Sequence, residues 1–250
     1  MESISSPTFV SFGYRCSCAG ILKDLGLKHE SYPFDWLISN LSVIQKCFSD
    51  DFKEFLNTEN YQRKYSNTYE MSDSTNCNEF ICNEHLMVNM FYQPIDKQNE
   101  ENTYQYNLAM NHHNICEENH LQYYSRCVQR MRDLFNNNNN KIYLHITKLI
   151  SKEKYIKDQI SILKNLIEFD DFIGSNVNGS LKGLIFILVK NPNEQHHCIR
   201  EILHESTTTK TKIFILFTNS RMIDAGEEFM GNYYDEIEFI KNKILESKNE

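Results

Sequence analysis

The chain of 250 residues carries a formal net charge of −8, and 40% of its residues are hydrophobic. These figures exclude a disordered chain and predict a folded protein with enough apolar residues for a sizeable core. The acidic balance leaves no broad basic surface for a phosphate backbone, so we expect no nucleic-acid partner. The sequence shows neither a secretory signal pattern nor an apolar run of membrane-spanning length, so we expect no membrane partner.

Eight cysteines are spread along the chain. We expect them to be reduced, in the cytoplasm, because a chain of this length without an export signal does not need disulfides.

The spacing of Cys77, Cys82 and His85 is too loose for a compact metal site, so we predict no metal. No phosphate-cradling glycine motif is present, and we predict no cofactor. The sequence does not indicate the oligomeric state.

The first predicted elements are a short strand and a helix. "PTFVSFG" (7–13) is typical of a buried strand that ends at Gly13, and "CSCAGILKDLGL" (16–27) has apolar residues at helical spacing, with Gly26 as its cap. Cys16 therefore falls at the first turn of a helix that follows a strand. The helix dipole and the neighbouring Arg15 favour a reactive thiolate there. The alternative is a buried structural thiol.

The next segment, residues 31–48, predicts a turn at the Pro33 step and then a helix that includes Leu37 and Ile38. Asp35 lies where this turn becomes the helix. Its carboxylate is suited to orient a histidine, or alternatively to cap the helix. The region 57–115 is polar, with one or two strands expected before Pro94. We therefore predict a single domain over 1–250, with 57–115 as an insertion or subdomain in the N-terminal half.

Strands and helices alternate clearly after residue 115. The predicted strands are 141–147, 183–190 and 212–218, and the predicted helices are 117–135, about 152–168, 193–205 and about 233–247. This alternation predicts an α/β fold with a mostly parallel sheet and helices on both faces. Ligands of such sheets bind beyond the carboxyl ends of the strands, which makes Gly13 and Arg221 candidate ligand-binding residues.

A nucleophilic cysteine needs a base to accept its proton. His112 and His113 are the best-placed candidates, because they are flanked by asparagines at a predicted loop-to-helix junction. His145, near the end of a strand, and His85 are further candidates. The residues alone do not decide among them.

Residues 9–39 resemble the N-terminal signature of a family of papain-like cysteine peptidases from bacteria and large DNA viruses. The matching residues are Ser11-Phe12-Gly13-Tyr14-Arg15-Cys16, then Leu25-Gly26-Leu27, then Pro33-Phe34-Asp35-Trp36-Leu37. The resemblance is looser over 108–147, where the family's histidine falls at His112 or His113 and its arginine-rich helix at Arg126, Arg130 and Arg132. It implies that Cys16 is the nucleophile, with a histidine base.

We therefore predict a cysteine-dependent hydrolase, a peptidase or amidase, that acts on a protein or peptide-like substrate. Cys16 attacks the carbonyl, His112 or His113 acts as base, and Asp35 orients the imidazole. Gly13, Arg15 and the backbone N–H groups of the helix surround the oxyanion. One alternative is a Rossmann-like protein that binds ligands or transfers glycan or sugar-nucleotide groups, with Cys16 structural and Arg221 at the crevice. The other alternative is a non-catalytic interaction protein.

Overall fold

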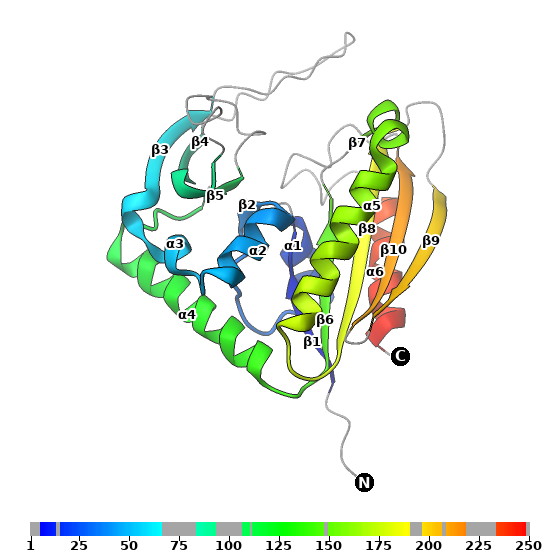
Figure 1. The fold of residues 1–250 in the computed structure, drawn as a ribbon, viewed down its shortest axis with the longest axis horizontal. Helices are drawn as coiled ribbons and strands as arrows, with labels where there is room; N and C mark the ends of the chain where they lie inside the picture. Colours follow the sequence, from blue (N-terminus) through cyan, green and yellow to red (C-terminus); the bar gives the residue numbers. More distant parts are fainter. Residues whose placement is uncertain are drawn as a thin grey trace. The chain divides into compact units, whose positions relative to one another are not determined.

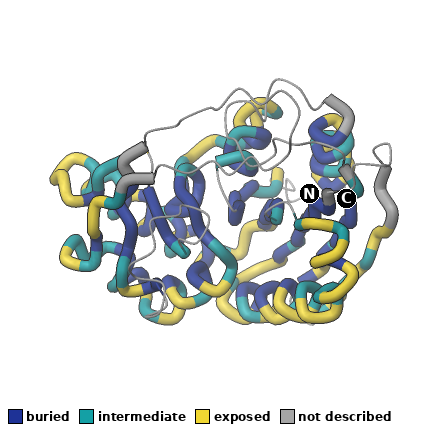
Figure 2. The backbone as a smooth tube through the Cα atoms, turned by 90° about the horizontal axis from the view of Figure 1, so that it is seen from above, coloured by how far each residue is buried: buried dark blue, intermediate teal, exposed yellow. Residues whose placement is uncertain are grey.

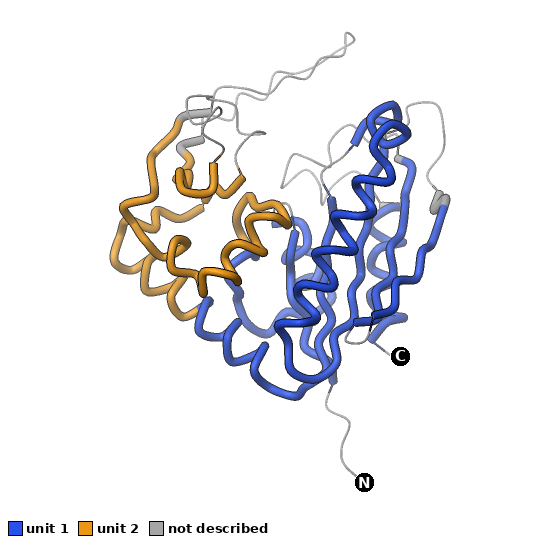
Figure 3. The backbone as a smooth tube through the Cα atoms, in the orientation of Figure 1, with its two compact units in different colours: residues 1–35, 127–250 blue, residues 36–126 orange. Residues whose placement is uncertain are grey.

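The computed structural model describes residues 6–13, 16–66, 84–93, 107–110, 112–147, 150–190, 197–206, 209–218 and 234–248. They belong to two compact units, which Figure 3 colours separately. Unit 1 comprises Met1–Asp35 and Cys127–Glu250, and unit 2 is the continuous segment Trp36–Arg126. Helix α4 (Glu118–Asn136) contains the second boundary. Within the described residues, no helix is long and apolar enough to span a membrane.

Sheet A, in unit 1, is mostly parallel. Its strands follow the order β1, β6, β8, β10 and β9, and the first four pair in parallel (Figure 1). β9 joins the edge in the antiparallel sense, and the short β7 pairs in parallel with β8. The prediction of an α/β fold with a mostly parallel sheet is confirmed. The strands are β1 (Thr8–Ser11), β6 (Lys141–Ile146), β7 (Ile150–Ser151), β8 (Leu181–Lys190), β9 (His197–Glu205) and β10 (Thr209–Thr218).

Helices α1 (Ser17–Asp24), α5 (Lys152–Ser175) and α6 (Tyr234–Lys248) pack on this sheet within unit 1. Apolar residues of α1 and α6 form one buried cluster with Leu144 of β6 and Phe186 of β8 (buried residues are dark blue in Figure 2). Tyr143, the neighbour of Leu144 on β6, instead contacts Phe169 of α5, with 6.1 Å between the ring centroids. Side chains on a strand alternate between its two faces, so these two contacts use different faces of β6.

A buried aspartate on α5 joins the helix to the sheet. Asp170 accepts hydrogen bonds from the hydroxyls of Tyr143 (2.7 Å), Thr209 (2.6 Å) and Thr211 (2.6 Å). The carboxylate therefore receives donors from both β6 and β10. Such bonds compensate for the burial of its charge.

The buried side chain of Lys141, at the start of β6, holds two loops together. Its ammonium group donates to the carbonyls of Asn137, Asn139 and Asn178 at 2.7–2.8 Å. Burial lowers the pKa of this ammonium group. The three backbone carbonyls solvate the charge in place of water, and they connect the asparagine-rich turn before β6 to the turn before β8.

Unit 2 contains an antiparallel sheet B with the strand order β2, β5, β4 and β3. β4 lies in the region where one or two strands are predicted before Pro94. Besides this sheet, the described part of unit 2 contains two short helices, two 3₁₀ turns and the first residues of α4. The bounds are β2 (Leu37–Ser39), α2 (Leu41–Ser49), α3 (Lys53–Leu56), η1 (Thr58–Asn60), β3 (Tyr61–Ser66), β4 (Glu84–Asn89), η2 (Met90–Tyr92) and β5 (Leu108–Met110).

Two helix predictions are wrong. Residues 37–39 form strand β2, and the helix begins only at Leu41, because the side chain of Asn40 caps it by accepting from Val43 N at 3.0 Å. Asp35 thus lies in a turn before a strand. Residues 197–205 form strand β9, because the edge of β10 supplies backbone partners that outweigh the helical spacing of the apolar residues.

Candidate functional site

Cys16 lies between the end of β1 and the start of α1. It is the N-cap residue of α1, and its side chain is half-buried. The first helical hydrogen bond runs from Gly20 N to Cys16 O, at 2.8 Å. The N–H groups of residues 17–19 therefore precede the helical bonding and form the positive end of the helix dipole. Arg15, the predicted neighbour of the thiol, lies outside the described residues.

The turn before Cys16 is fastened by His145. Phe12 N still donates to Leu144 O at 2.8 Å, as in a parallel ladder, but the carbonyl of Phe12 accepts from Nδ1 of His145 at 2.5 Å. A carbonyl only accepts, so Nδ1 carries the proton. Burial lowers the pKa of His145 to about 4, which makes the imidazole neutral at pH 7 with its lone pair on Nε2. Its position at the carboxyl end of β6 agrees with the strand predicted there.

Cys18, two residues after Cys16, is a contrasting thiol. It is fully buried, and burial raises its pKa far above the ordinary value. Charge on Cys16 and on Asp35 raises that pKa further, while a hydrogen bond with the backbone of Ile146 opposes the shift. Cys18 is therefore an inert packing thiol, and Cys16 and Asp35 both lie within electrostatic range of it.

Asp35 is a buried carboxylate with two partners. The ammonium group of Lys28 forms an ion pair with it, and Tyr32 N donates to the same carboxylate oxygen at 2.7 Å. Burial raises the pKa of Asp35, and these two partners oppose the shift. No histidine is among its hydrogen-bond partners within the described residues, so its role in orienting an imidazole stays a prediction. The sequence did not predict the role of Lys28, because six residues of irregular chain lie between it and Asp35.

His112 and His113 belong to unit 2, just before α4. His112 is exposed, whereas His113 is half-buried against the rings of His120 (4.8 Å between centroids) and Tyr123 (5.1 Å). Nδ1 of His113 is buried and has no hydrogen-bond partner among the described residues. Burial lowers the pKa of His113, and the two neighbouring histidines lower it further, so its neutral form is favoured.

Ligand atoms of Asp170, Asp171 and His204 lie within 4.8 Å of one another, the one such group among the described residues. Both oxygens of Asp170 accept hydroxyl hydrogen bonds, and Nε2 of His204 lies 3.1 Å from Asp171. These contacts form a protein hydrogen-bond network rather than an open set of metal ligands. Of the predicted ligand-binding residues, Gly13 follows β1, and Arg221 lies outside the described residues.

The fold and the site define a mostly parallel α/β unit with a partly exposed thiol where the first strand passes into the first helix. Residues 7–189 match a protein family described as "putative papain-like cysteine peptidase". The match spans more than half of the chain, and the chain belongs to this family. No curated protein and no solved structure matches the chain.

Proposed function

We propose that the protein is a cysteine-dependent hydrolase of peptide or other amide bonds, with Cys16 as its nucleophile. The observation that carries this proposal is the position of Cys16, a partly exposed thiol at the N-terminus of α1. Membership of a peptidase-like family supports it and suggests protein substrates. The buried Cys18 lacks this exposure, so the nucleophile is assigned to the first cysteine of the pair.

The reaction divides into two steps. The base accepts the thiol proton, the thiolate attacks the substrate carbonyl, and the C–N bond breaks as the base returns the proton to the leaving amine. Water then hydrolyses the thioester and releases the acid and the thiol. The N–H groups at the start of α1 stabilise the oxyanion in both steps. His112 and His113 stay the predicted bases, and the neutral form favoured for His113 suits an acceptor of protons.

The second candidate is a protein for ligand binding or for glycan or sugar-nucleotide transfer, in which Cys16 is structural. The mostly parallel sheet favours it, because ligands of such sheets bind beyond the carboxyl ends of the strands. In that case a sugar nucleotide would raise the melting temperature of the wild type and of Cys16→Ser equally.

The test is the rate at which iodoacetamide alkylates each cysteine as a function of pH, followed by mass spectrometry. Cys116 is the internal reference, because it is more exposed than Cys16. We expect Cys16 to react faster than Cys116 at about pH 6, since only a thiol with a pKa well below about 8.5 is ionised there. Slower reaction of Cys16 than of Cys116 at every pH would refute a nucleophilic role.

The same profile identifies the base. His112→Ala, His113→Ala and His145→Asn are compared with the wild type, and the base is the residue whose loss raises the apparent pKa of Cys16. Hydrolysis of a fluorogenic peptide mixture provides the second readout, with Cys16→Ala as the inactive control. Activity that survives in Cys16→Ala would remove Cys16 from the mechanism.

A further inference from the structure

A pocket of about 450 Å³ opens in unit 1 at the amino end of β1, whereas Cys16 follows the carboxyl end. Its volume falls in the range of small-molecule sites. Its walls come from the start of β1, from residues 27–32, from the second half of α4 and from Asn137, which follows α4. Its lining includes Phe9, Leu27, Glu30, Arg130, Asp133 and Leu134.

The lining of this pocket separates into apolar and charged parts. Phe9, Leu27 and Leu134 are buried and offer an apolar surface. Glu30 and Asp133 are exposed and carry the negative charges of the rim. A ligand that fits both parts has an apolar body and a polar end.

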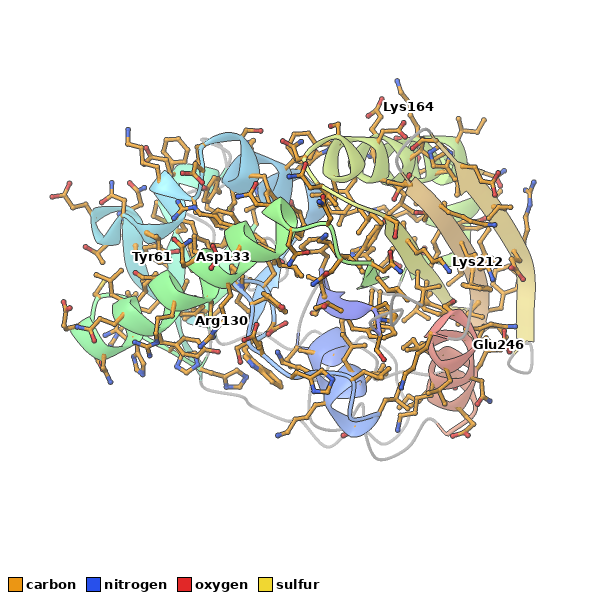
Figure 4. The ribbon with its side chains drawn as sticks, turned by 90° about the horizontal axis from the view of Figure 1, so that it is seen from below. Tyr61, Arg130, Asp133, Lys164, Lys212 and Glu246 are labelled. Carbon is orange, nitrogen blue, oxygen red and sulfur yellow. The ribbon has the colours of Figure 1, made fainter. Side chains whose placement is uncertain are left out.

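Arg130 is the cation of the pocket, and it comes from α4, as does Asp133 (Figure 4). Arg130 is half-buried, and its two side-chain hydrogen bonds to described residues, to Ser31 O (3.2 Å) and to Sγ of Cys127 (3.9 Å), both come from Nη1. Within the described residues no carboxylate forms an ion pair with it. Nε and Nη2 therefore remain as donors toward an anion, and the guanidinium geometry suits a carboxylate.

We propose that this pocket binds a free amino acid with an apolar side chain. The ligand carboxylate pairs with Arg130, the side chain lies on Phe9, Leu27 and Leu134, and the ammonium group faces Glu30 and Asp133. The two rim carboxylates repel a doubly charged anion such as phosphate, which favours a zwitterion. The inference does not depend on the chemistry of Cys16.

The test is calorimetric titration of the full chain with four probes: L-leucine, L-leucinamide, N-acetyl-L-leucine and inorganic phosphate. We expect saturable binding of L-leucine, and at least about tenfold weaker binding of leucinamide, which lacks the carboxylate. N-acetyl-L-leucine lacks the ammonium charge and is expected to bind more weakly than leucine. Phosphate should not compete.

Arg130→Gln should weaken L-leucine binding at least about tenfold, as is usual when a charge-assisted hydrogen bond is lost. The matched control is Arg126→Gln, an exposed arginine one turn earlier on α4 that does not line the pocket. Asp133→Asn changes an exposed residue, so it provides a test even if Arg130→Gln fails to fold. It should weaken the binding of L-leucine more than the binding of N-acetyl-L-leucine. No saturable leucine binding, equal binding of leucinamide, competition by phosphate, or an unchanged affinity in Asp133→Asn would each overturn the proposal.

Discussion

His145 links the end of β1 to the backbone that leads to Cys16. The paired residues of β1 and β6 end at Ser11 and Leu144, and the next carbonyl of the chain, that of Phe12, accepts from the imidazole of His145. The imidazole supplies the donor, because a buried carbonyl without one is costly. The sequence shows His145 near a strand end but does not show that its ring closes this turn, since the contact joins residues 133 positions apart.

Protonation of His145 should couple stability to pH. Its pKa falls from 6.5 in the unfolded chain to about 4 in the folded protein, so the unfolded chain binds the proton more readily. The contribution of the neutral His145 to the free energy of unfolding is therefore fully present above pH 6.5. It is lost as the pH falls from 6.5 to about 4, which lowers the free energy of unfolding by up to roughly 3 kcal/mol. Urea denaturation at pH 7 and about pH 4.5 measures this loss.

The variant His145→Asn keeps a donor for Phe12 O but has no titrating ring, so it should lose much less stability between the two pH values than the wild type. The exposed His29 provides the control, and His29→Asn should retain the full pH dependence of the wild type. An identical pH dependence in His145→Asn and the wild type would assign the acid sensitivity to other groups.

Among the elements, β8 shows why a glycine is needed in the middle of a sheet. A Cβ atom added at Gly183 would lie 2.3 Å from the Thr211 hydroxyl and 2.6 Å from that of Tyr143. Both hydroxyls donate to Asp170 of α5. The missing side chain thus lets two neighbouring strands direct their hydroxyls to one carboxylate.

Two glycine-to-alanine variants should therefore change stability in opposite directions. Gly183→Ala should lower the free energy of unfolding by about 1–3 kcal/mol, because the extra methyl group overpacks the hydroxyl network. Gly20→Ala should raise it by about 0.5–1 kcal/mol, because this position lies inside helix α1 with nothing within 4 Å of the added atom. Urea denaturation of both variants at pH 7 measures these changes. An unchanged free energy of unfolding in Gly183→Ala would contradict the packing argument.

Elements with strong periodicity were predictable, and those defined by distant partners were not. α4 and α6 bury apolar residues at the spacing that their sequences indicate, and β8 and β10 each contain a continuous apolar run. α5 is a helix as predicted, but Ile156 and Ile160 of its expected apolar face are exposed, and the helix instead buries Tyr155, Phe169 and Ile173. β9 has apolar residues at spacings compatible with a helix, and only the edge of β10 makes it a strand. At the candidate site, the turn signal located Cys16 and Asp35, but the ion pair with Lys28 depends on an irregular loop.

For the whole molecule, charge is the property that composition fixes most directly. The chain has 34 acidic residues and 26 basic ones. Nucleic-acid affinity depends on neutralising phosphates with lysine and arginine, so we expect no mobility shift of duplex DNA or single-stranded RNA at about 100 mM salt. A shift that weakens as salt increases would show a local basic surface that the total charge conceals.

The three hydrogen bonds from the Lys141 ammonium group to backbone carbonyls form a clamp between two turns. This clamp restricts how the asparagine-rich tract at 136–140 can evolve. The ammonium group binds main-chain carbonyls, which every residue type possesses, so the clamp itself does not require asparagine at 137 or 139. The spacing is less permissive, because one added or deleted residue would move a carbonyl away from the buried charge. Gly179 adds to this constraint, since it has a positive φ of 82° and a Cβ there would lie 2.7 Å from the carbonyl oxygen of Asn138. Over evolution, residue types in this tract should therefore change more readily than the number of residues. A low-complexity tract alone would suggest the reverse, a length that varies freely.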